Sequence, residues 1–81
     1  PPQVIRIDID ASSVISWNGQ ALADRAALQA QLAQAALLQP QPELHIRPNK
    51  LAAYQHVAMI LAGAQRLGMT KIGIVGNEQF Q

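Results

Sequence analysis

The 81-residue sequence predicts a small two-layer α+β fold, in which a mixed β-sheet carries two helices on one face in a ββαβαβ-type order. Three observations lead to this prediction. Residues 4–10 alternate apolar and polar side chains, residues 24–38 and 51–67 repeat apolar residues with helical spacing, and a strand-like stretch follows each helical segment. With both helices on one face, the other face of the sheet is left to solvent or to a partner.

The first strand is expected at Val4–Asp10. Its apolar residues Ile5, Ile7 and Ile9 occupy every second position, so they face the core while the polar residues between them face out. This alternation is typical of a half-buried strand.

A hairpin is expected next. Val14–Trp17 forms its first strand, and Asn18-Gly19 is the dipeptide best suited to the positive φ values of a tight hairpin turn. Gln20–Leu22 would then pair briefly with the first strand of the hairpin. Trp17, beside the turn, has two interpretations: a hydrophobic anchor for a partner, or ordinary packing of the hairpin on a helix.

The first helix is expected to begin at Ala23 or Asp24 and to end at Leu38. The Asp24 carboxylate is well placed to interact with the positive end of the helix dipole. The residues Gln39-Pro40-Gln41-Pro42 end the helix, because a proline disfavours helical geometry in the residue before it. The apolar stripe of this helix is formed by Leu28, Leu32 and Ala35, with Leu38 at its flank.

The second half of the chain predicts a strand–helix–strand unit. Leu44–Arg47 is the first strand, Pro48-Asn49-Lys50 a turn, and Leu51–Leu67 the helix. Gly68 is expected to end the helix in the left-handed conformation, and Lys71–Val75 follows as a β-branched strand parallel to the first.

This second half resembles the C-terminal domain of the ExbD/TolR family. The resemblance is carried by a strand, a Pro/Asn turn, a helix with Tyr54 in its first turns, a stop at Gly68 and the strand Lys71–Gly76 followed by Asn77-Glu78. That last strand is the most specific piece, and it favours the ExbD branch over the TolR branch. The upstream strand, hairpin and helix fall in the family's order too, so the resemblance covers nearly the whole chain.

The resemblance implies one periplasmic domain, residues 1–81, of a single-pass inner-membrane protein in a Gram-negative bacterium. A membrane helix absent from this chain would contact an ExbB-like protein. The domain itself would form a homodimer and bind a TonB-like protein, so that the proton gradient drives outer-membrane transport. The alternative is a TolR-like subunit of the Tol-Pal system that contacts the cell wall and TolA. The family's usual Ala-Asp pair is replaced here by Pro48-Asn49, so no role of that acid is carried over.

Composition and spacing argue against several other functions. The formal net charge of +1 offers no basic patch for nucleic acid, no apolar run approaches the ~20 residues of a membrane helix, and the absence of cysteine rules out thiolate sites. His45 and His56 lack the spacing of metal ligands, and Asp8 and Asp10 alternate with apolar residues as on any solvated strand. We therefore predict no catalytic residue, no metal, no cofactor and a non-enzymatic protein.

Sheet edges remain as the main resource for binding, because an edge strand presents unpaired N–H and C=O groups. We predict that a partner segment adds as a strand to an edge and open face formed by the first and last strands. Tyr54 is expected to cover the edge of the core rather than to bind. The residues predicted to bind a partner are Ile5, Ile7, Ile9, Trp17, Lys71, Ile72, Ile74 and Val75.

Overall fold

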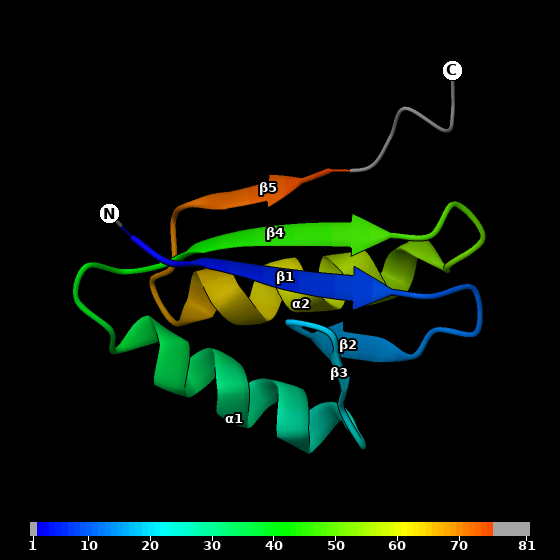
Figure 1. Cartoon of the computed structure of the whole chain (residues 1–81), viewed down its shortest axis with the longest axis horizontal. Helices are drawn as coiled ribbons and strands as arrows, with labels where there is room; N and C mark the ends of the chain where they lie inside the picture. Colours follow the sequence, from blue (N-terminus) through cyan, green and yellow to red (C-terminus); the bar gives the residue numbers. More distant parts are fainter. Residues whose placement is uncertain (1, 76–81) are drawn as a thin grey trace.

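A computed structural model describes residues 2–75 of the chain, and its elements follow the predicted order (Figure 1). The α+β class with two helices and a mixed sheet is confirmed. The elements are β1 (Val4–Ile9), β2 (Ile15–Trp17), β3 (Gln20–Ala21), α1 (Arg25–Ala36), β4 (Glu43–Pro48), α2 (Tyr54–Arg66) and β5 (Ile72–Ile74).

The sheet has five strands in the order β3-β2-β1-β4-β5. β4 is parallel to both β1 and β5, whereas the β1–β2 and β2–β3 pairs are antiparallel. The expectation that the first strand lies at an edge is wrong. The hairpin extends the sheet on one side of β1 and the strand–helix–strand unit extends it on the other, which leaves β1 in the middle.

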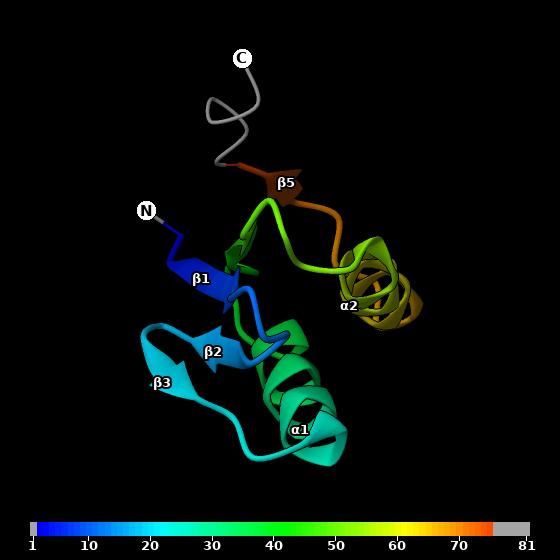
Figure 2. The same cartoon turned by 90° about the vertical axis from the view of Figure 1, so that its right-hand side faces the viewer.

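Both helices lie on one face of the sheet, and no helix or strand of residues 2–75 covers the opposite face (Figures 1 and 2). The core lies between these two layers, as the alternation in β1 and the stripes of both helices predict. Its buried residues are Ile5, Ile7, Ile9, Leu28, Leu32, Ala35, Leu44, Ile46, Val57, Ile60, Ala64 and Met69.

Both helices begin later in the chain than predicted, because local hydrogen bonds hold the residues before them in non-helical conformations. Asp24 is the N-cap of α1, and its side chain accepts a 2.9 Å hydrogen bond from the Ala27 N–H. α2 begins three residues later than expected, because Asn49 Oδ1 accepts a hydrogen bond from the Leu51 N–H (2.9 Å) and holds the chain in a turn. Tyr54, the first residue of α2, is 71% exposed, so the prediction that it covers the core was wrong.

The end of α2 follows the prediction for Gly68. This residue has a φ of +82°, and the Gly68 N–H donates to the Gln65 carbonyl at 3.0 Å. The next N–H, that of Met69, donates to the Ala64 carbonyl at 3.1 Å. These two bonds form a Schellman motif, which reverses the chain and directs it into β5.

The other strands and α1 are slightly shorter than predicted, except β4, which extends to include Pro48 paired with Ile9. Asn18 and Gly19 have φ values of 50° and 90°, which confirms the predicted hairpin turn. Neither helix of the described residues is long and apolar enough to cross a membrane.

Candidate functional site

The predicted binding residues of the first strand lie in the core. Ile5, Ile7 and Ile9 are each 4% exposed or less, and β1 is hydrogen-bonded to β2 on one side and β4 on the other. Neither their side chains nor the main chain of β1 is available for strand addition. The alternation in β1 places the three isoleucine side chains on the face of the sheet that the helices cover.

Trp17 packs against the core from β2, directly opposite Ile7 in the strand register, and it is partly buried. The structure therefore places this side chain in the packing of the hairpin, the second of its two interpretations.

The predicted binding residues of the last strand lie together at a sheet edge. The Lys71 carbonyl accepts a 2.8 Å hydrogen bond from the Leu44 N–H, and the Val75 N–H donates to the Ile46 carbonyl at 2.9 Å. Because main-chain groups alternate in direction along a strand, those of Ile72 and Ile74 point away from β4. Among residues 2–75, no strand pairs with that side of β5.

The side chains around this edge suit an extended, partly apolar ligand. Ile74 is 40% exposed and Val75 36% exposed, while Ile72 packs partly buried against the core. Gly73 lies between them, with no heavy atom within 4 Å of a Cβ built on it, so the backbone is accessible from the uncovered face. An added strand would gain main-chain hydrogen bonds and would bury the two isoleucines further.

The uncovered face of the sheet is mainly polar. Arg47 Nε lies 3.5 Å from Asp8 Oδ1, and His45 Nε2 lies 3.1 Å from Glu43 Oε1. These groups are partly exposed, so the pairs contribute little to stability. Besides these charged groups, this face carries the side chain of Val4, which is 47% exposed and alternates with the buried Ile5.

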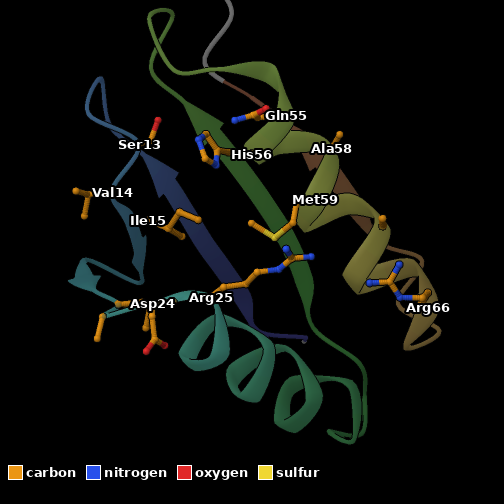
Figure 3. Close-up of a pocket in the computed structure, with 13 residues that line it drawn as sticks. Ser13, Val14, Ile15, Asp24, Arg25, Gln55, His56, Ala58, Met59 and Arg66 are labelled. Atoms are coloured by element: carbon orange, nitrogen blue, oxygen red, sulfur yellow. The ribbon is translucent and has the colours of Figure 1, made fainter.

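A second surface, which sequence reasoning did not predict, is an open groove of about 770 Å³ on the helical face (Figure 3). Its walls come from α2, the start of α1 and the turn before β2. α1 and α2 approach each other near Gly63, where a built Cβ would lie 3.6 Å from Leu32 Cδ1. The groove was missed because its lining comes from segments far apart in the sequence.

The ionisable groups in the described part of the chain all keep some exposure to solvent. No polar or charged residue there is buried, and no three His, Asp or Glu side chains are grouped to hold a metal ion. The two surface features of the described residues are the outer side of β5, with which no strand pairs, and the open groove on the helical face.

Comparison with known proteins gives two similarities. Residues 1–79 match the family described as "Biopolymer transport protein ExbD/TolR". Over 77 residues the chain is 38% identical to a protein of Xanthomonas campestris pv. campestris named "Biopolymer transport protein exbD2". The aligned region covers 93% of this chain and 56% of that protein, so the chain spans about half the length of this curated relative.

Proposed function

Since this chain belongs to the ExbD/TolR family, described as biopolymer transport proteins, we propose that it is a non-enzymatic periplasmic interaction domain of an ExbD-like subunit. In this proposal the domain binds a TonB-like protein and forms a homodimer. A membrane helix outside the present chain connects it to an ExbB-like protein, and the assembled complex couples the proton gradient of the inner membrane to outer-membrane transport.

The observation that carries this proposal is the free edge of β5. Its outward main-chain groups belong to Ile72 and Ile74, as the bonds of Lys71 and Val75 to β4 indicate. An extended periplasmic segment of a TonB-like protein would pair with these groups as a sixth strand. Main-chain hydrogen bonds would supply affinity, and the exposed side chains of Ile74 and Val75 would fix the register.

The same edge is the candidate for homodimer formation. The uncovered face is mainly polar, so a two-fold dimer gains more from pairing one β5 with the β5 of a second copy. A dimer of this kind uses the groups of Ile72 and Ile74 that the TonB-like segment would need. Strand addition and dimerisation at β5 therefore exclude each other, and saturating peptide is expected to lower the dimer fraction measured by sedimentation.

A proline scan of the peptide tests strand addition. Synthetic peptides from the periplasmic region of a TonB-like protein are titrated into the ¹⁵N-labelled domain, with a single proline moved through successive positions. Proline lacks an N–H, so it weakens binding only where that N–H faces β5. Because strand main-chain groups alternate, affinity should fall at every second position, and the tolerated positions serve as matched controls.

A different periodicity would reject the proposal. Equal affinity at every proline position would indicate a groove that reads side chains alone, and losses at every interior position would indicate a helical ligand, because proline disrupts a helix on any face. The chemical shifts should change at residues 71–75 in the strand-addition case.

The family description includes TolR, so a TolR-like role in contact with the cell wall is the second candidate. The printed name of the relative, exbD2, favours the first. Sedimentation of the domain with insoluble peptidoglycan separates the two: retention of the domain in the pellet supports the TolR-like role, and its recovery in the supernatant supports the ExbD-like one.

A further inference from the structure

We propose that the groove bounded by α2, the turn before β2 and the start of α1 is a second docking site, which binds an acidic amphipathic helix of a partner protein. This site lies on the helical face (Figure 3), and none of the residues that line it belongs to β5. Its occupancy does not depend on strand addition, so the two surfaces can be tested independently.

The shape of the groove follows from the contact between the helices. α1 and α2 meet near Gly63, and the space opens on the side that faces the β1–β2 turn and the start of α1. One wall is a stripe of α2 from Gln55 through Ala58 and Ala62 to Arg66. At 1.5 Å per residue this stripe is roughly 16 Å long, about the length of three turns of a docked helix.

The lining of the groove is apolar at its centre. Ile15, Leu22 and Met59 are all partly buried hydrophobic residues that pack against the core, and each also lines the groove. Ala58 and Ala62 have short side chains, which allow the axis of another helix to approach to within the usual 8–10 Å. A ligand therefore meets an apolar surface with room for side chains of the size of leucine.

The lining of the groove carries two arginines and one carboxylate, that of Asp24, which caps α1 by accepting the Ala27 N–H. The arginines are Arg25 and Arg66, and within residues 2–75 neither belongs to an ion pair. Arg25 is also the first residue of α1, where the helix dipole disfavours a cation. An acidic ligand would provide the partner that this arginine lacks.

The carboxylates of the described residues are already engaged. Asp8 pairs with Arg47, Glu43 pairs with His45, and Asp24 accepts the capping hydrogen bond of α1. Asp10 Oδ1 accepts hydrogen bonds from two N–H groups of the turn that follows it. With a net charge of +1 and the same two arginines in the groove of each copy, a second copy of this chain is a poor electrostatic match for the groove.

The walls of the groove determine which secondary structure its ligand must have. The α2 wall bonds its main-chain groups within the helix, so an extended strand finds no ladder to join there. Side chains must provide recognition, and the helix-in-groove mode reads apolar residues spaced three and four apart. The ligand that fits is a helix with an apolar face flanked by aspartate or glutamate.

The test is a selection from a randomised library of 14-residue peptides displayed against the domain. We expect enriched peptides to carry apolar residues at three- and four-residue spacing together with Asp or Glu. In ¹⁵N spectra of the domain, the chemical-shift changes that these peptides cause should lie at Met59, Ala62 and Leu22. Arg25→Gln should weaken their binding about threefold or more, and added salt should weaken it further.

Matched variants separate charge from shape. Lys50→Gln removes a positive charge at an exposed turn residue that does not line the groove, so it should leave the affinity unchanged. Ala58→Gln adds bulk at an exposed position of the wall and should reduce binding while the melting temperature of the domain stays close to the parent value. Arg25→Gln also keeps the fold, because it removes a cation from the unfavourable end of a helix dipole.

Three results would overturn the proposal. Enrichment of neutral or basic peptides contradicts the charge argument, as does equal affinity for Arg25→Gln and the parent. Shifts confined to Ile72–Ile74 place the peptides at the sheet edge instead of the groove. Concentration-dependent shifts of Met59 and Ala62 in the absence of peptide identify a second copy of the chain as the occupant.

Discussion

The two edges of the sheet are built in opposite ways. At one edge, β3 is two residues long, follows directly from a tight turn, and leaves the sheet for the capped start of α1. At the other, β5 lies parallel to β4 between two further main-chain bonds, those of Lys71 and Val75. Brevity and turn geometry limit the β3 edge, whereas the outer side of β5 has no strand paired with it among residues 2–75, and there we propose strand addition.

The hairpin turn beside β3 is stabilised by the side chain of one of its own residues. Asn18 Oδ1 accepts a 2.8 Å hydrogen bond from the Arg6 N–H, and the Asn18 N–H donates to the Arg6 carbonyl at 2.8 Å. This pair of bonds ties the hairpin turn to β1. At β5 the equivalent local control comes from the Schellman motif at Gly68, which fixes where the strand begins but covers none of its outer edge.

The largest effect is expected at the start of the β5 edge. Gly68→Val should lower the free energy of unfolding by about 1 to 2 kcal/mol, because a β-branched residue is strained at the φ of +82°. A Cβ built there has no heavy atom within 4 Å, so the cost is conformational rather than steric crowding. Thermal and urea unfolding measure it.

Gly73→Ala is the matched control for this substitution. Gly73 lies in β5, has no positive φ, and likewise has open space around a built Cβ. Alanine at this position should leave the stability within about 0.5 kcal/mol of the parent value. If Gly68→Val unfolds at the same denaturant concentration as Gly73→Ala, the chain reversal before β5 does not depend on the left-handed glycine.

A smaller effect is expected at the turn that closes the β3 edge. Gly19→Ala should cost about 1 kcal/mol, since Gly19 has a φ of 90° and the nearest neighbour of a built Cβ is Arg6 Nη2 at an ordinary 3.9 Å. The loss should be local because β3 has two residues. Amide exchange should speed up at Leu22, whose N–H donates to the Ile15 carbonyl at 2.9 Å, and stay unchanged in β5. Faster exchange throughout the sheet would show that the two edges are coupled.

The smallest effect concerns self-association. Lys71 is exposed beside the open edge, and a lysine at such a position opposes unspecific strand pairing. Lys71→Thr should tighten dimerisation by about fivefold, corresponding to roughly 1 kcal/mol, in equilibrium sedimentation. Gln20→Thr on β3 is the control and should have no effect. If Gln20→Thr tightened association and Lys71→Thr did not, the dimer contact would lie at the opposite edge, that of β3.

Local signals in the sequence predicted most elements of the fold. Alternation identified the buried isoleucines of β1, helical spacing identified Leu28, Leu32 and Ala35, and single residues identified the turn at Gly19 and the stop at Gly68. Each of these features depends on residues that are close in sequence, so the chain itself carries the information.

Features that depend on distant contacts were predicted less well. The central position of β1 depends on which side of it the hairpin and the strand–helix–strand unit add, and both arrangements satisfy the same alternation. The groove was missed because its lining residues are likewise far apart in the sequence. Local signals, the end of the last helix and a short β-branched run, located β5 as a strand, whereas its predicted edge position is confirmed by the strand order of the sheet.

Amide hydrogen exchange of Ile72 and Ile74 tests the central claim most directly. Their N–H groups point to the free edge, so we expect fast exchange in the isolated monomer and slow exchange when a TonB-type periplasmic peptide is bound. The Ala21 amide on β3 should keep the same rate in both states. Unchanged exchange at Ile72 and Ile74 with the peptide at saturation, or protection of Ala21 instead, would contradict strand addition at β5.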